Sequence, residues 1–168
     1  MVITEGPNRY EPIKFLASCA NLPTYPYLYT LFRGKFRPVG SDANVYWTHV
    51  RKCFLDGKQS MVRKASRKCR QYLEYEVKAL EPRLILAVGK SAFKALRAGS
   101  RDKRLKRQLK DAFKKQLRGP FKDVNIFGVK VDLAVLPHPS GRNRFWNKPP
   151  KETPEILNTI SEAILKTV

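Results

Sequence analysis

The chain has 168 residues, of which 42% are hydrophobic and 11% aromatic, enough apolar side chains to build the core of a single domain over residues 1–168. Lysine and arginine number 34 against 14 acidic residues, so the formal net charge is +20 at pH 7. This composition excludes a disordered tail. Because so large a positive charge repels itself unless an anion relieves it, it favours nucleic acid as the partner.

The apolar runs, such as Leu84–Val88, fall far short of the roughly twenty residues that a membrane-spanning helix needs. The start, Met1–Gly6, lacks the charged region and apolar stretch of a signal peptide. We therefore expect a cytoplasmic protein that does not bind membranes. The three cysteines cannot all pair within the chain, and an intracellular compartment disfavours disulfides.

In the first half of the chain, short β-branched runs alternate with stretches of helical period. Val2–Thr4 is a very short apolar run, and Val45–Thr48 predicts a strand from its β-branched and aromatic residues. Lys14–Ala20 predicts one or two helical turns, and Leu22–Tyr29, rich in proline and tyrosine, predicts a loop. Apolar side chains recur at three- and four-residue spacing from Met61 to Leu80, which predicts a helix.

The second half continues the alternation. Leu84–Val88 is a continuous apolar run of strand length, typical of a strand covered on both faces in a parallel sheet. Ser91 is expected to be the N-cap of a helix that reaches about Ala98. Val129–Leu136 predicts a further strand, and Pro154–Val168 predicts a terminal helix.

A basic helix is predicted over Arg101–Arg118, where apolar residues form a narrow stripe and nearly all other positions are basic. A second basic cluster lies on the helix predicted over Met61–Leu80. Such charge is ordinarily a solvated face, but here it exceeds what solubility requires, so we interpret both segments as contacts to the phosphate backbone. The stripe is Leu105, Leu109, Phe113 and Leu117, and the second cluster is Arg63, Lys64, Arg67, Lys68 and Arg70.

The repeated order of strand and helix predicts an α/β fold, a three-layer sandwich with a central parallel four-stranded sheet flanked by helices. In such sheets, binding sites form at the carboxyl ends of the strands. Four segments are therefore expected to meet along one edge of the sheet, which we term the rim. They are Glu5–Asn8, His49–Cys53, Gly89–Ser91 and His138–Asn147.

These segments resemble the uracil-DNA glycosylase superfamily, especially its thermostable prokaryotic branches. Val2–Asn8 looks like the first family motif, a strand that ends in a Gly-Glu-Ala-Pro-Gly type of turn. Val45–Cys53 is similar to the second strand, and Glu81–Gly89 to the central strand. Leu136–Gly141 contains His-Pro-Ser, which matches the second catalytic motif and is the most specific element. Four collinear matches at strand ends are fairly strong support for the family.

The resemblance implies a monomeric, monofunctional DNA glycosylase that acts on single- or double-stranded DNA. Such an enzyme flips a damaged or modified base, uracil or a related one, out of the stack and hydrolyses its N-glycosidic bond. His138 is the candidate donor to the leaving base, and Glu5 or Asn8 would orient the water. The alternative interpretations are a turn residue for His138 and a strand-end cap for Glu5.

The base pocket implied by the resemblance is formed by Gly6, Pro7 and His49. The vigorous uracil-specific branch places a water-activating aspartate where this chain has Gly6. The branches with the most similar second strand place an asparagine, which reads the edge of uracil, where this chain has His49. Because histidine cannot copy that bidentate pattern, a different altered base or a relaxed pocket is an open alternative to uracil.

The loop after His138 is expected to enter DNA, with its arginines on phosphates and an aromatic side chain wedged where the base has left. The alternative for the aromatic pair is closure of the core beneath the loop. The predicted DNA-binding residues are Ser140, Gly141, Arg142, Asn143, Arg144, Phe145 and Trp146.

Cys53 and Cys69 match, by their spacing, two of the four iron–sulfur ligands in the thermostable branches. The relatives supply the other two as Cys-x-x-Cys before the first strand, whereas this chain has only Cys19 besides. We therefore expect no cofactor and no metal, with Cys53 and Cys69 as buried small hydrophobes. The alternative is a natural chain that begins earlier, in which these two cysteines would be cluster ligands.

Two other functions remain open at the level of sequence. Gly6 and His49 depart from the active branches, which is compatible with a weak or inactive relative that only binds nucleic acid. A basic RNA- or ribosome-associated protein would explain the charge but not the His-Pro-Ser motif.

Overall fold

The computed structural model describes residues 1–6, 24–35, 44–52, 59–107, 118–139, 143 and 151–167. Its strands form one sheet in the order β2-β1-β3-β5-β4. The parallel strands are β1 (Val2–Thr4), β2 (Trp47–His49), β3 (Leu84–Val88) and β5 (Val129–Leu136). The predicted α/β fold with four parallel strands is thus confirmed. A fifth strand that the sequence did not predict, β4 (Arg118–Ile126), runs antiparallel to β5 at the edge of the sheet.

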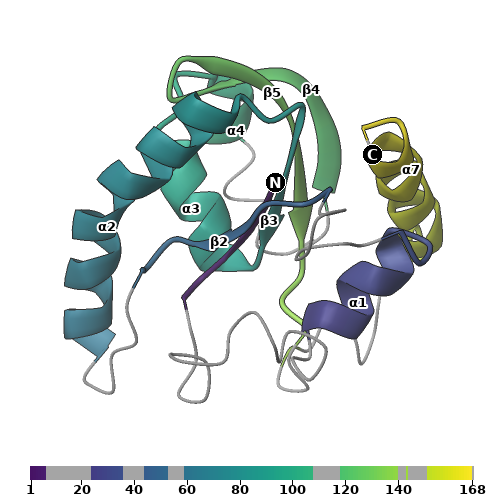
Figure 1. Cartoon of the computed structure of the whole chain (residues 1–168), viewed down its shortest axis with the longest axis horizontal. Helices are drawn as coiled ribbons and strands as arrows, with labels where there is room; N and C mark the ends of the chain where they lie inside the picture. The colour runs from purple at the N-terminus through teal and green to yellow at the C-terminus, as the bar shows by residue number, and fades with distance from the viewer. Residues whose placement is uncertain are drawn as a thin grey trace.

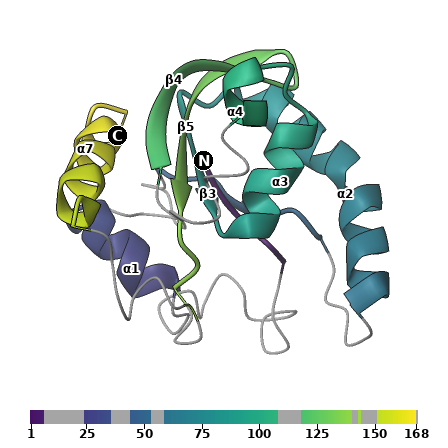
Figure 2. The same ribbon diagram turned by 180° about the vertical axis from the view of Figure 1, so that it is seen from behind.

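Helices cover both faces of the sheet, which gives the predicted three layers (Figure 1, Figure 2). On one side lie α1 (Thr24–Leu31) and α7 (Thr153–Leu165). On the other lie α2 (Gln59–Leu80), α3 (Lys90–Ala98) and α4 (Lys103–Arg107).

The residues of β3 alternate between the two cores. Leu84, Leu86 and Val88 pack in the core beneath α1 and α7, whereas Ile85 and Ala87 pack in the core beneath α2 and α3. Both faces of β3 are therefore covered, which explains its unbroken apolar sequence. Of the helices in the described ranges, none combines the length and apolar character needed to cross a membrane.

The loop predicted over Leu22–Tyr29 is wrong, because α1 begins at Thr24. Pro26 is the third residue of this helix, and the N–H groups of a first turn have no partner inside the helix, so a proline there removes no hydrogen bond. The turns predicted over Lys14–Ala20 lie outside the described residues.

The basic helix predicted over Arg101–Arg118 is described only as α4, and residues 108–117 lie outside the described part of the chain. Its predicted end is wrong, because Arg118 begins β4. Leu105, the first residue of the predicted apolar stripe, is fully buried.

The N-cap of helix α3 lies two residues earlier than predicted. Gly89, not Ser91, is its N-cap, and Ser91 lies in the first turn. Gly89 has a φ of +86°, a backbone conformation that side chains other than glycine rarely adopt. The terminal helix begins at Thr153 and ends at Leu165, so the predicted extension to Val168 is not observed, and Val168 itself is outside the described residues.

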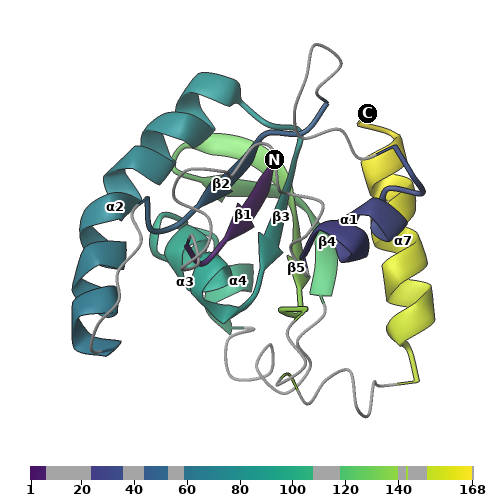
Figure 3. The ribbon, with the colours of Figure 1, turned by 60° about the horizontal axis from the view of Figure 1, so that its bottom comes forward.

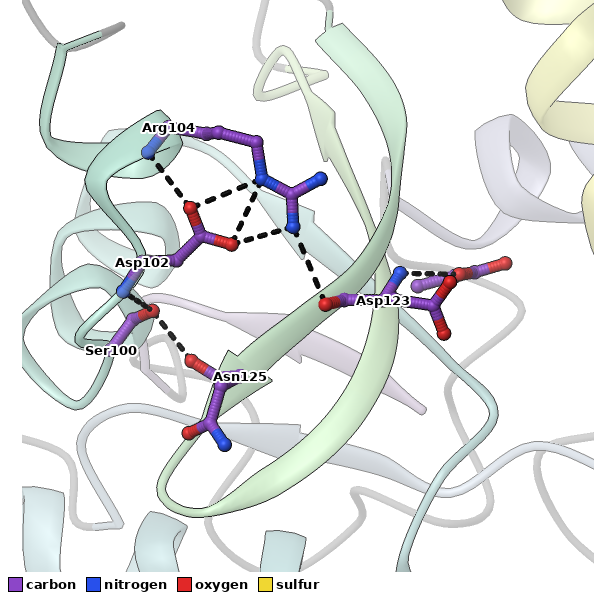
Figure 4. Close-up of polar contacts among 6 residues, drawn as sticks. Ser100, Asp102, Arg104, Asp123 and Asn125 are labelled. Atoms are coloured by element: carbon purple, nitrogen blue, oxygen red, sulfur yellow. Dashed lines mark hydrogen bonds and ion pairs between the residues drawn. The ribbon is translucent and has the colours of Figure 1, made fainter.

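A polar network attaches the α3–α4 connection to β4 (Figure 4). Ser100 Oγ donates a hydrogen bond of 2.5 Å to the carbonyl oxygen of Asn125 and accepts one of 3.1 Å from the amide of Asp102. Arg104 Nη2 donates to Asp102 Oδ2 at 2.6 Å and to the carbonyl oxygen of Asp123 at 3.3 Å. This network lies near the amino ends of the parallel strands, away from the rim at their carboxyl ends.

Candidate active site

The carboxyl ends of β1, β2, β3 and β5 lie along one edge of the sheet, as predicted, and the described parts of the rim segments begin there (Figure 3). Backbone hydrogen bonds continue the pairing past the strand ends. The amide of Val50 donates to Thr4 O at 2.9 Å, and the amide of Gly89 donates to Leu136 O at 2.8 Å. The segments after the strands are therefore held side by side as they enter the rim.

Glu5, Gly6 and His49 lie together at the ends of β1 and β2. The imidazole Nδ1 of His49 shares a hydrogen bond with the hydroxyl of Thr4. Burial, followed by the nearby charges of Lys52 and Arg51, lowers the pKa of His49 to about 4. His49 is therefore neutral at pH 7, with one ring nitrogen as donor and the other as acceptor.

Lys52 is held by a polar cluster that joins β2 to α2. Its ammonium group lies 2.5 Å from Thr48 Oγ1 and 2.5 Å from Glu76 Oε2. Thr48 Oγ1 also donates to Glu76 Oε2 at 3.0 Å. The carboxylate of Glu76 thus balances the charge of Lys52 and fixes α2 against the end of β2.

Arg51 packs against Gly6. A Cβ atom placed on Gly6 would lie 2.7 Å from Arg51 Nε and 2.8 Å from Nη2, closer than a side-chain carbon approaches other atoms. Gly6 has no positive φ, so the close guanidinium, not the backbone conformation, is what favours glycine here. Arg51 is only 8% exposed, and its Nε has no hydrogen-bond acceptor within the described ranges.

His138 lies at the end of β5, beside Gly89 at the end of β3. A Cβ atom on Gly89 would be 3.5 Å from both Cβ and Cδ2 of His138, an ordinary packing distance. The side chain of His138 is exposed at the rim. Asn143 Nδ2 donates a hydrogen bond of 2.8 Å to the carbonyl oxygen of His138, which links these two residues of the segment that the sequence assigned to the rim.

A basic cleft of about 460 Å³ opens next to Glu5 and runs between α2 and α3. Four cationic side chains line it, together with two serines and several apolar residues. Glu5 lines the end of the cleft that meets the rim, so the cleft leads from the candidate site along the surface. The cations of the basic cleft are Arg67, Arg70, Lys90 and Lys94.

Several predicted site residues lie outside the described part of the chain. These are Pro7, Asn8, Ser140, Gly141, Arg142, Arg144, Phe145 and Trp146. Their assigned roles remain predictions.

Of the three cysteines in the sequence, one lies within the described residues. Cys69 is a buried free thiol on α2, whereas Cys19 and Cys53 lie outside the described residues. Three cysteines are one fewer than a four-thiolate cluster needs. In the part of the chain that is described, no group of three or more His, Cys, Asp or Glu side chains is placed to bind a metal ion.

Sequence reasoning did not identify Thr4 or Arg51 as parts of the site. Thr4 is the last residue of a strand, and only the pairing of β1 with β2 brings its hydroxyl to His49. Arg51 follows a strand in a strongly basic chain, so nothing in the sequence separates it from the exposed arginines. Its burial depends on tertiary packing against Gly6.

A family model described as the uracil DNA glycosylase superfamily matches residues 21–161, most of the chain. A comparison with curated proteins found no match.

Proposed function

The chain belongs to the uracil DNA glycosylase superfamily, and from this premise we propose that it is a monofunctional DNA glycosylase that removes a damaged or modified base. The observation that carries the proposal is the meeting of Glu5, Gly6 and His49 at the ends of β1 and β2, along the same rim as His138. A carboxylate and a hydrogen-bond donor beside a reading residue are the groups that glycosidic hydrolysis requires.

In the proposed reaction the C1′–N bond of the flipped nucleotide breaks, and its electron pair leaves on the base. His138 donates a hydrogen bond to an oxygen of the departing base and stabilises the negative charge that develops there. Water adds to C1′ and gives its proton to Glu5, with Asn8 as the second candidate for orienting the water. The base then takes a proton from solvent, and an intact strand with an abasic site remains.

The neutral His49 bears on the choice of base. Because Nδ1 is bonded to Thr4, only Nε2 can read a base, which is fewer atoms of a base edge than a carboxamide reads, so the pocket accepts more than uracil alone. Uracil and hypoxanthine, the deamination products of cytosine and adenine, are the first substrates to test.

The test uses single- and double-stranded oligonucleotides that carry uracil, hypoxanthine or another altered base, followed by alkali to cut at abasic sites. We expect cleavage by the wild-type chain and a loss of at least about 100-fold in His138→Ala. Asn158→Ala, at an exposed position on α7, is the control and should cleave as the wild type does.

The second candidate function is a nucleic-acid-binding relative without glycosylase activity. It is favoured by Gly6, which offers no carboxylate where the vigorous branch has one, and by the guanidinium that fills the adjacent space. Tight, salt-sensitive binding with no cleavage of any substrate would establish this second function and reject the first.

A further inference from the structure

Arg51 is a buried cation at the candidate site with no described counter-charge. The residue is 8% exposed, and none of the ion pairs among the described residues involves it. The neighbouring cation, Lys52, is by contrast held by Thr48 and Glu76. Burial of an unbalanced charge is unfavourable, so a guanidinium kept in such a place is expected to meet an anion during function.

The position of Arg51 is fixed by the ends of the two strands. Its backbone amide donates to the carbonyl oxygen of Glu5 at 3.0 Å, and its guanidinium lies over Gly6. The same cation acts on His49, whose pKa it helps to lower. The guanidinium is therefore placed beside Gly6 and His49, the two described residues of the base pocket.

We propose that Arg51 is an anion-binding residue of the pocket and that its guanidinium binds an anionic oxygen of the flipped nucleotide beside Gly6. The inference rests on the proposed glycosylase function and deepens it. Two oxygens have the required chemistry: the base oxygen that becomes negative as the C1′–N bond breaks, and a phosphate oxygen next to the flipped nucleotide. A guanidinium recognises both through the same donor fork.

This assignment changes the role of residue 6. A guanidinium occupies the space that a side chain at position 6 would fill, so the site carries a cation in that space. If the bound oxygen is that of the leaving base, stabilisation of the leaving anion carries more of the catalysis than activation of water does.

The test replaces Arg51 by methionine, which keeps much of the length and loses the charge. Two quantities are measured on the same uracil-containing oligonucleotide: the single-turnover excision rate at saturating protein, and the Kd with its dependence on salt. Arg83→Met is the matched control, because Arg83 is an exposed arginine just before β3, at the opposite edge of the sheet.

If Arg51 binds the base oxygen, the excision rate falls by about 10²–10³-fold while the Kd changes little. If it binds a phosphate, the Kd rises and the slope of log K against log salt becomes shallower by about 1. Arg51→Met that matches Arg83→Met in both rate and Kd would overturn the proposal.

A second variant keeps the test decisive if Arg51→Met does not fold. Gly6→Ala places a carbon 2.7 Å from Arg51 Nε and must displace the guanidinium, so it should cause the same kind of loss to a smaller degree. If Gly6→Ala folds and changes neither rate nor Kd, the proposal is again rejected.

Failure of the glycosylase function is distinguishable from failure of this inference. A wild-type chain that cleaves no substrate rejects the glycosylase, and the Kd arm alone then decides whether Arg51 binds an anionic oxygen.

Discussion

His49 is held between the hydroxyl of Thr4 and the cations Lys52 and Arg51, and its ring is partly buried. Burial, followed by the charges of Lys52 and Arg51, lowers the pKa of His49 and keeps the residue neutral over the physiological range. Because Thr4 bonds Nδ1, the neutral ring presents Nε2 alone to a base, as donor or acceptor according to the tautomer. Removal of its neighbours would therefore alter the hydrogen-bonding pattern of the pocket without any change at position 49.

The lowered pKa of His49 makes the stability of the protein depend on pH. The folded-state pKa of about 4 lies below the ordinary 6.5, so between these pH values the unfolded chain binds a proton that the folded chain does not. The free energy of unfolding therefore decreases as pH falls from about 6.5 to about 4, by on the order of 3 kcal/mol from this residue.

Denaturant unfolding at pH 7 and pH 4.5 measures this effect, because other groups that titrate contribute equally to wild type and variant. His49→Asn should lose less stability than the wild type does between the two pH values. The control is Asn158→Ala on α7, which keeps both histidines and should retain the wild-type dependence. Equal pH dependence in His49→Asn and wild type would contradict the prediction.

At the scale of elements, α2 connects the two functional regions. One side of the helix packs on the sheet through Leu73 and Val77, both fully buried. Glu76, one residue before Val77, holds Lys52 at the end of β2, while Arg67 and Arg70 line the basic cleft. The register of α2 on the sheet thus sets both the end of β2 and the position of the cleft.

Truncation of Leu73 tests how much this packing contributes. Leu73 is 0% exposed, so Leu73→Ala removes buried methyl groups and leaves a cavity, and we expect a loss of about 2–5 kcal/mol in the free energy of unfolding. The matched control on the same helix is Tyr75→Ala. Tyr75 is 68% exposed, so its truncation should change stability by less than about 0.5 kcal/mol. Similar losses in both variants would mean that α2 does not pack as described.

The elements that the sequence predicted well are those whose burial is evident from their own pattern of apolar residues. The two-sided burial of β3 produces an unbroken apolar run, and the predicted bounds of β3 and β5 match the structure. The long periodic pattern of α2 likewise located it within two residues at its start. Strong local patterns are sufficient for such elements.

β4 could not be predicted for a physical reason. Its ladder with β5 has register shifts between Arg118 and Phe121 and again between Phe121 and Val124, so its buried residues do not alternate regularly. Gly119 and Pro120 also favour a turn or an edge strand over a central strand. The strand forms because it pairs with the long strand β5. That pairing is a tertiary contact, which the local sequence of β4 does not indicate.

The candidate site was also predictable from the sequence only in part. The rim was predictable because parallel strands place their carboxyl ends at one edge. The contacts that tune it, Thr4 with His49 and Gly6 with Arg51, join residues more than forty positions apart and depend on the register of β1 and β2. Register is set by packing on both faces, which local sequence does not specify.

At the scale of the whole molecule, part of the positive charge behind the net +20 is concentrated in one place. Part of it lines the basic cleft, which begins at Glu5 and lies between α2 and α3. A phosphate backbone in this cleft would lead directly to the rim. The measured signature of such contacts is a linear fall of log K with log salt.

Neutralisation of two cleft arginines tests this. The double variant Arg67→Gln/Arg70→Gln should bind an oligonucleotide more weakly, and its slope of log K against log salt should be shallower by about 2. The control is Arg83→Gln/Lys130→Gln, which removes the same charge. Both residues are exposed and lie at the amino ends of β3 and β5, away from the rim. Equal slopes for the two double variants would show that net charge, and not the cleft, governs binding.

The short strand β1 has a consequence for the integrity of the site. Its three residues stand between β2 and β3, so within the sheet β2 is joined to the other strands only through β1. Local opening of β1 therefore separates His49 and Arg51 from His138 while leaving the β3–β5–β4 part of the sheet paired. The free energy of that opening, measurable by hydrogen exchange of the Val50 amide that donates to Thr4, sets an upper limit on how persistently the complete pocket exists.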